Sequence, residues 1–246
     1  MATADRWISS VERKIKAFAE RHAFVFQHTA RQVSASFEIG CFHALSEFYV
    51  NNFSVIPANL TEEGEYRYLT SPTGNPKNFS YLKLESALEN FELRQQIRIR
   101  SHLHSDIAFT PDLVILRASA ELESARDRDY AAGKRSLYFV DSSNVVAAHE
   151  CKSLNPFREL LVGFIGMLIV AHDWLGKPNA ITSSLTGPHL APTLFVGGSA
   201  RALHLRMIAA LEMTYPINVV VGLHSGTWSL LGSGRSLNRL LVVPSM

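Results

Sequence analysis

The sequence predicts a mixed α/β protein in which helices flank a mixed β-sheet. Three observations support this fold class: helical periodicity near the start, short apolar strands in the middle, and alternating helices and strands near the end. No repeat and no clear linker divides the 246 residues, so we expect one domain over residues 1–246. Within it we expect N-terminal helices over 1–55, a central segment over 92–175 and a C-terminal α/β extension over 190–246.

Composition and charge place the chain among ordinary globular proteins. The net charge is +2, which neither requires nor excludes a nucleic-acid partner. The two cysteines, Cys41 and Cys151, provide no disulfide framework and fit a reducing cytoplasm. The longest apolar run, Leu160 to Ala171, is shorter than the roughly 18–20 residues that span a bilayer. We therefore expect a cytoplasmic protein without a membrane partner.

Two helices are expected before the sheet. Apolar residues recur at helical spacing from Ala4 to His22, and a second helix is expected from Val33 to Asn51. On a helical wheel the second helix gathers its apolar side chains on one face, and Glu38 lies inside that face. Glu47 lies on the opposite side with His43, and these two are expected to pair on a solvated face. A carboxylate in an apolar stripe needs a reason, so Glu38 is a candidate functional residue.

The middle of the chain predicts strands. A turn-rich stretch follows residue 51, and its chain breakers are Gly64, Pro72, Gly74 and Pro76. Residues 79–85 alternate weakly and predict a strand, whereas 85–96 fits a helix or a strand equally well. Residues 97–103 alternate, and 113–116 form a short apolar run, so both predict strands. The charged segment 121–134 is expected to be a helix or a loop.

The second half predicts a hairpin followed by alternating helices and strands. Residues 137–140 and 145–152 flank the turn-forming sequence 141–144, which favours a β-hairpin. A helix is expected to begin at an Asn155 cap and to end near Gly176. We then expect a strand at 193–196, a helix at 199–213, and strands at 217–223 and 239–243.

Two strand ends carry the residues that suit phosphodiester chemistry. Asp112 follows Pro111 at the entry to an apolar strand, and Glu150 and Lys152 end another. Because side chains alternate along a strand, Glu150 and Lys152 share one face. Buried charges of this kind are costly unless they are paired or bind a metal. Two carboxylates suit Mg²⁺, and a neighbouring lysine can orient water or stabilise negative charge.

Pro111-Asp112 followed by Glu150-Cys151-Lys152 resembles the PD-(D/E)xK signature of restriction-endonuclease-like nucleases. The resemblance covers roughly residues 33–171 and implies a restriction-endonuclease-like core, with 92–175 as its catalytic part. It implies that Asp112, Glu150 and the backbone carbonyl of Cys151 hold Mg²⁺, with Mn²⁺ as a substitute. Lys152 would position water or stabilise charge, and Glu38 matches a helix glutamate of such families. The long gap between the two half-motifs requires an insertion near residues 121–134.

The resemblance also implies an endonuclease that hydrolyses DNA. A basic stripe formed by Arg98, Arg100, His102 and His104 is a candidate phosphate-facing surface, although a solvated strand edge would look the same. Cleavage of both strands would call for a homodimer. No nucleotide-binding motif is evident, so a partner ATPase or helicase, or a recognition subunit, is compatible with the sequence. A role in bacterial antiviral defence or restriction is expected by analogy.

Two other functions stay open at the sequence level. The first is a non-catalytic nucleic-acid-binding or assembly module of the same fold. The second is a zinc-dependent hydrolase, because His102, His104 and Asp106 resemble the HxHxDH motif of metallo-β-lactamase-fold enzymes. Ile107 stands where that motif has its last histidine. The motifs do not specify which nucleotide sequence is recognised. They also do not distinguish a DNA substrate from an RNA substrate.

Overall fold

The computed structural model describes residues 13–14, 17, 33–124, 138–172, 189–225 and 240–241. The α-helices that lie entirely within these ranges are α2 (Val33–Val50), α4 (Arg158–Ala171) and α5 (Ala202–Thr214). A large sheet contains β1 (Ser54–Ala58), β2 (Tyr81–Glu85), β3 (Asn90–Gln95), β6 (Leu113–Arg117), β9 (Val145–Lys152), β11 (Thr193–Val196) and β12 (Asn218–Val220). A small sheet contains β4 (Arg98–Arg100), β5 (Ala108–Phe109), β7 (Glu123–Ser124) and β8 (Tyr138–Asp141). A separate pair joins β10 (His189–Leu190) to β13 (Leu240–Leu241).

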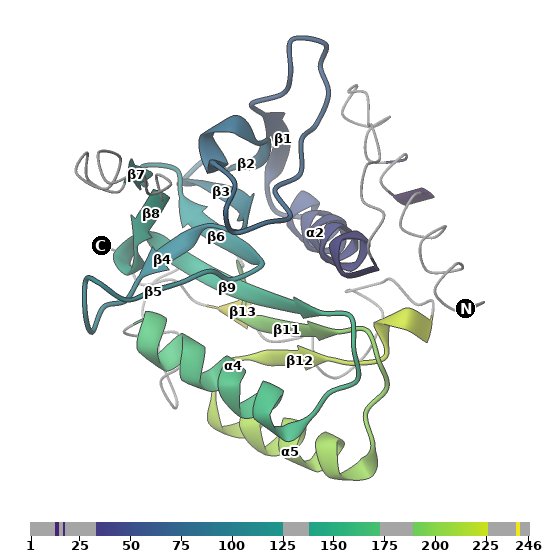
Figure 1. The fold of residues 1–246 in the computed structure, drawn as a ribbon. Coiled ribbons are helices and arrows are strands. Elements are labelled where there is room, and N and C mark those ends of the chain that lie inside the picture. The colour runs from purple at the N-terminus through teal and green to yellow at the C-terminus, as the bar shows by residue number, and fades with distance from the viewer. Residues whose placement is uncertain are drawn as a thin grey trace.

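The large sheet is mixed, as the sequence predicts. Its order is β1-β2-β3-β6-β9-β11-β12, with antiparallel pairing from β1 to β9 and parallel pairing from β9 to β12. Parallel neighbours need a crossover, and α4 and α5 supply the two crossovers. Helix α2 packs on β1 and β9, while α4 and α5 lie together on the other side of the sheet (Figure 1). The result is a sheet covered by helices on both faces.

The antiparallel pairing of β6 with β9 positions the candidate residues. Leu113, the first residue of β6, pairs with His149 near the end of β9. Asp112, one residue before Leu113, therefore lies beside the residues that follow His149. The strand β11, from the expected C-terminal extension, pairs with the other edge of β9 and places Leu194 opposite Glu150. The extension and the central segment thus share one sheet.

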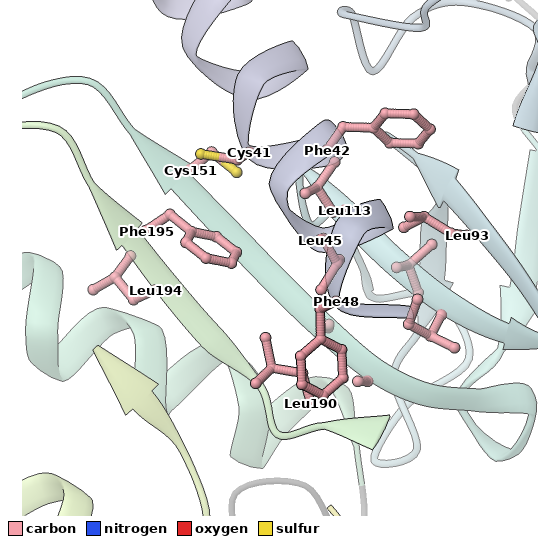
Figure 2. Packing of buried hydrophobic residues seen from close by; sticks show 14 of the residues in the cluster. Cys41, Phe42, Leu45, Phe48, Leu93, Leu113, Cys151, Leu190, Leu194 and Phe195 are labelled. Atoms are coloured by element: carbon pink, nitrogen blue, oxygen red, sulfur yellow. The ribbon is translucent and has the colours of Figure 1, made fainter. Parts of the chain in front are cut away.

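Helix α2 is buried on nearly all sides rather than on one face. Phe42 and Leu45 pack towards the sheet near Leu93 and Leu113 (Figure 2). On its other side His43 is only 1% exposed and shares a 2.6 Å hydrogen bond with the Tyr68 hydroxyl. The predicted pairing of Glu47 with His43 on a solvated face is therefore wrong, because the segment after β1 covers that face.

Most predicted elements are found within a few residues of their expected bounds. These include the helix of α2 and the strands at 79–85, 113–116, 145–152 and 193–196. The ambiguous segment 85–96 is a turn followed by β3. Helix α4 begins at Arg158 with Phe157 at its N-terminal cap, so the expected Asn155 cap is wrong. Apart from residues 13, 14 and 17, the expected helix at 4–22 lies outside the described residues, as does most of segment 121–134.

The predicted hairpin over 137–152 is wrong. Strand β8 pairs with β4 and β7 in the small sheet, whereas β9 pairs with β6 and β11. The short 3₁₀ helix Ser142–Asn144 carries the chain from one sheet to the other. Both edges of β9 are already occupied, so no edge is left for β8. The strand expected at 97–103 is likewise reduced to β4 and belongs to the small sheet.

Strand β1 was not predicted, because it lies at the start of the turn-rich stretch and contains Pro57. A proline is tolerated at a sheet edge, where its missing N–H costs no ladder hydrogen bond, and β1 is one of the two edge strands of the large sheet. Within the described residues, no helix combines the length and the apolar character needed to cross a membrane.

Two glycine substitutions test the packing around the crossovers. A Cβ at Gly198 would lie 2.7 Å from the Asn155 Cα, so Gly198→Ala forces the loop before α4 to move. We expect it to lower the free energy of unfolding by about 1–3 kcal/mol. A Cβ at Gly163 in α4 meets nothing within 4 Å, so Gly163→Ala should raise it by roughly 0.5–1 kcal/mol. Urea unfolding measures both changes, and equal effects of the two substitutions would contradict this packing.

Candidate functional site

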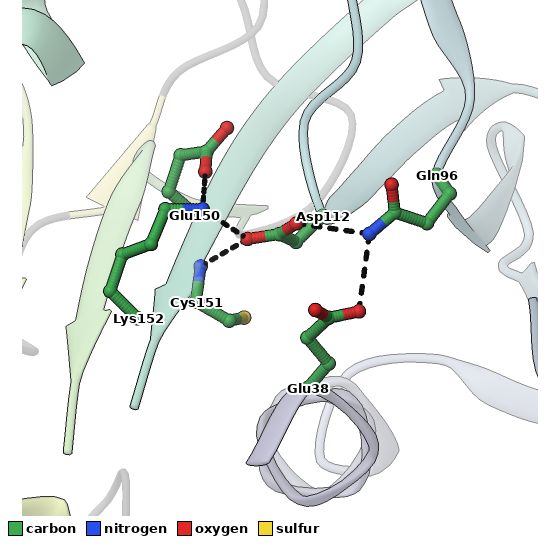
Figure 3. Close-up of polar contacts among 6 residues, drawn as sticks. All are labelled: Glu38, Gln96, Asp112, Glu150, Cys151 and Lys152. Atoms are coloured by element: carbon green, nitrogen blue, oxygen red, sulfur yellow. Dashed lines mark hydrogen bonds and ion pairs between the residues drawn. The ribbon is translucent and has the colours of Figure 1, made fainter. Parts of the chain in front are cut away.

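The candidate site forms where four segments meet at one corner of the large sheet (Figure 3). Asp112 lies just before β6, and Glu150 and Lys152 lie at the end of β9. Helix α2 brings Glu38 towards this corner, and Gln96 follows the last residue of β3. The structure thus brings together Asp112, Glu150, Lys152 and Glu38, the four residues that the sequence predicts as catalytic.

Asp112 is the centre of the hydrogen-bond network. Its Oδ2 accepts a 2.7 Å hydrogen bond from the backbone N–H of Cys151 and a 3.0 Å hydrogen bond from Lys152 Nζ. Its Oδ1 accepts a 3.0 Å hydrogen bond from Gln96 Nε2. The residue is only 7% exposed, so these three donors replace most of its hydration. The carboxylate is therefore held in one orientation.

Lys152 connects two carboxylates. Its Nζ lies 2.6 Å from Glu150 Oε2 and 3.0 Å from Asp112 Oδ2. Burial by itself would lower the pKa of this ammonium, but Asp112 and Glu150 together outweigh burial and raise the pKa above its ordinary value. Lys152 therefore stays protonated near neutral pH, and its positive charge is available at the site.

The two glutamates carry raised pKa values. Burial, and then the charge of Asp112, raise the pKa of Glu150 to about 8 even though Lys152 acts in the opposite direction. The same two causes raise the pKa of Glu38 to about 7, against the hydrogen bond from Gln96 and the charge of Lys152. Three carboxylates thus share one ammonium, and their mutual repulsion is only partly offset. A further positive charge would stabilise the ionised form of all three.

The chemistry of these donors fits a hard divalent cation. All three side chains offer carboxylate oxygens, which Mg²⁺ prefers, and Mg²⁺ commonly keeps several waters and binds through one or two carboxylates. Within the described ranges, no three His, Cys, Asp or Glu side chains form a cage for a metal by themselves. The carboxylates of Asp112 and Glu150 are the donors here that could hold a partly hydrated Mg²⁺. The predicted contribution of the Cys151 carbonyl stays a prediction.

Cys151 has a buried side chain. The residue is 5% exposed, and its thiol lies beside Cys41 of α2 (Figure 2). Burial raises the pKa of the Cys151 thiol well above its ordinary value, so the thiolate needed of a nucleophile does not form. The backbone of Cys151 is the part that serves the site, through its N–H.

Gln96 is the site residue that the sequence analysis missed. Its side-chain amide nitrogen donates to Asp112 Oδ1 and, at 3.1 Å, to Glu38 Oε2. No sequence motif includes this residue. It is the last residue of segment 85–96, whose pattern fits a helix or a strand equally well. Its position depends on the turn from β3 to β4, which is not visible in the sequence pattern.

The predicted basic stripe is spread over several environments. Arg98 and Arg100 lie on β4 in the small sheet, and Arg100 forms ion pairs with Glu123 at 2.9 Å and Asp141 at 3.1 Å. His102 shares a 3.0 Å hydrogen bond with the Ile169 carbonyl at the end of α4, and His104 is exposed. Arg100 is thus already neutralised by carboxylates, and a role for this stripe in phosphate binding stays a prediction.

The three residues of the zinc alternative do not converge. His102 contacts the backbone of α4, whereas His104 Nδ1 lies 3.9 Å from Asp106 Oδ2 in an exposed loop. Both His104 and Asp106 have mainly exposed side chains. The arrangement in the described residues therefore offers no tetrahedral set of ligands here.

Comparisons with protein-family models, curated proteins and solved structures found no significant match. The interpretation of the site therefore depends on its own geometry and chemistry.

The raised carboxyl pKa values predict how the stability of the metal-free protein changes with pH. A carboxyl group whose pKa is raised in the folded state binds its proton more tightly there than in the unfolded chain. Its contribution to the free energy of unfolding therefore falls as the pH rises from about 4.5 to about 8. Burial lowers the pKa of His149 and His172 to about 3. These two histidines make the free energy of unfolding rise with pH, but only below their unfolded pKa of 6.5. Between pH 6.5 and 8 the free energy of unfolding should therefore fall, by on the order of 1 kcal/mol per pH unit.

Thermal unfolding in EDTA across this pH range measures how the melting temperature depends on pH. This dependence should be weaker in Glu150→Gln than in the wild type. A melting temperature that is level in the wild type, or that falls equally in Glu150→Gln, would show that Glu150 does not hold a proton in this range.

Proposed function

We propose that this protein is a metal-dependent nuclease of the PD-(D/E)xK type, an endonuclease that hydrolyses phosphodiester bonds in DNA with Mg²⁺. The observation that carries the proposal is that Asp112 and Glu150 both pair with the single ammonium of Lys152, while Gln96 joins Glu38 to Asp112. A cluster with excess negative charge would repel a phosphodiester unless a cation were added. Carboxylates, a divalent cation and a lysine are the groups that phosphodiester hydrolysis requires.

The surrounding elements support the same proposal. Strand β6 follows Asp112, β9 pairs with β6 and ends in Glu150 and Lys152, and α4 follows β9. The strand after Asp112, the strand that ends in Glu150 and Lys152, and the helix after it support the resemblance. The hairpin expected before Glu150 is not part of this support, because β8 belongs to the small sheet. The long gap between the two half-motifs contains β7 and β8, which belong to the small sheet rather than to the core. The insertion therefore leaves the pairing of β6 with β9 intact.

The mechanism assigns a separate task to each side chain. Asp112 and Glu150, with the Cys151 carbonyl, would hold Mg²⁺, and Mn²⁺ is expected to substitute. When bound, the ion supplies polarisation of a phosphoryl oxygen and activation of water. Lys152 stays protonated and so can donate hydrogen bonds to the attacking water or to the negative charge that develops on phosphorus-bound oxygens. Glu38 adds a carboxylate at the same corner and can accept a proton near neutral pH.

A binding module without catalysis is less compatible with the site. Phosphate binding uses arginine and lysine side chains that face solvent. Here the only lysine of the cluster is bonded to two carboxylates, and Asp112 is almost fully buried. Such an arrangement costs stability and offers little attraction for DNA, so a binding role alone does not account for it.

The partners follow from the proposed reaction. DNA is the proposed substrate, and cleavage of both strands by one active site per chain would require a homodimer. The same chemistry is compatible with a partner ATPase, helicase or recognition subunit that delivers the DNA, as in bacterial antiviral defence or restriction. These partners are proposals by analogy with the reaction class.

Cleavage of plasmid and linear DNA tests the proposed function. We expect cutting with Mg²⁺ or Mn²⁺, none in EDTA, and a loss of about 100-fold or more in Asp112→Asn and Lys152→Ala. Lys83→Ala, which removes an exposed lysine on β2, is the matched control and should cut like the wild type.

Metal-dependent cutting that survives Lys152→Ala would place the active site elsewhere. No cutting of DNA or RNA by the wild type with either metal would contradict the proposed function itself.

A further inference from the structure

Gln96 has an unusual backbone conformation at the candidate site. Its φ is 51°, in the left-handed region, and among the described residues only Asn59 shares this property outside glycine. Asparagine adopts this region comparatively easily, whereas glutamine has no such preference. Residues that keep an unfavourable conformation cluster at functional sites, where the surrounding structure holds them in place. The turn at Gln96 is also the point where the chain leaves β3 for β4 of the small sheet.

The side chain of Gln96 joins two of the proposed catalytic carboxylates (Figure 3). Its Nε2 lies 3.0 Å from Asp112 Oδ1 and 3.1 Å from Glu38 Oε2. The backbone N–H of Gln96 also donates to the Asp112 carbonyl at 3.1 Å. Backbone and side chain of one residue therefore fix the position of Asp112 and connect it to α2, an element far away in the sequence.

An amide suits this position for a simple electrostatic reason. Its NH₂ group has two donors and no net charge, so it can hold two carboxylates without neutralising them. An ammonium at the same place would compete with a metal cation, as Lys152 already does at Oδ2 of Asp112. Each carboxylate keeps lone pairs that the amide does not use. Hydrogen bonds of this kind orient carboxylate ligands and contribute strongly to metal affinity.

We propose that Gln96 is a positioning residue, which orients Glu38 and Asp112 so that the site binds a divalent cation. This inference rests on the proposed function, because it assigns Asp112 to the metal. It does not make Gln96 a catalytic residue, since Gln96 acts through the two carboxylates that it holds.

The neighbouring Gln95 provides a matched comparison. It is 3% exposed, and its side-chain amide has no hydrogen-bond partner among the described residues. Replacing either glutamine by methionine keeps an unbranched side chain of similar volume and removes the amide. Gln96→Met therefore removes the two hydrogen bonds to carboxylates, whereas Gln95→Met removes none.

The experiment measures Mn²⁺ binding to the full-length protein by titration calorimetry, alongside the melting temperature of each variant. We expect Gln96→Met to weaken Mn²⁺ binding by about 10–100-fold, and Gln95→Met to bind like the wild type. Gln96→Gly should weaken binding equally, and its melting temperature should fall less than that of Gln96→Met, because glycine adopts the left-handed conformation without strain. In cleavage assays, the Mg²⁺ concentration for half-maximal activity should rise in step for both Gln96 variants.

Two results would overturn the inference while leaving the proposed function intact. The first is wild-type Mn²⁺ affinity in Gln96→Gly or Gln96→Met. The second is an equal loss of affinity in Gln95→Met, which would show a general effect of packing. Failure of the wild type itself to bind Mn²⁺ would instead remove the proposed function, and the inference with it.

Discussion

The hydrogen bond from the Cys151 amide to the Asp112 carboxylate joins the end of β9 to the start of β6, and the candidate site depends on it. At 2.7 Å it continues the contact between the two strands beyond the last pair of their ladder, Leu113 with His149. Because Cys151 is held in this way, Glu150 and Lys152 on either side of it project together from the opposite face. Lys152 then reaches back to Asp112, and Gln96 connects Asp112 to Glu38. Four segments from different parts of the sequence thus converge on one carboxylate.

The electrostatics of this corner work against the stability of the fold. Three carboxylates and one ammonium are partly or largely buried, and the raised pKa values of Glu38 and Glu150 record that their ionised forms are disfavoured. The rest of the molecule compensates through burial of α2 and of both faces of β9. Protein structures commonly retain such local costs at functional sites. A divalent cation would relieve the repulsion, so under the proposed function metal binding would also stabilise the fold.

The sequence predicts the parts of the site that local patterns encode. Strand alternation places Glu150 beside Lys152, the apolar run after Asp112 marks a strand entry, and the helical wheel turns Glu38 inward. Gln96 could not be predicted, because its role arises from a left-handed turn between two sheets. The hairpin at 137–152 failed for a related reason: local turn chemistry does not reveal that both edges of β9 are taken by β6 and β11. Likewise, the burial of His43 depends on a distant segment that contributes Tyr68.

The central claim is that Asp112 and Glu150 together hold a divalent cation. The most direct measurement is a crystal structure grown with Mn²⁺, in which anomalous scattering locates the ion without reference to activity. The account predicts a peak within coordination distance of the carboxylates of Asp112 and Glu150. A crystal that shows no peak at this corner, or whose only peak lies beside His102, His104 and Asp106, would contradict it.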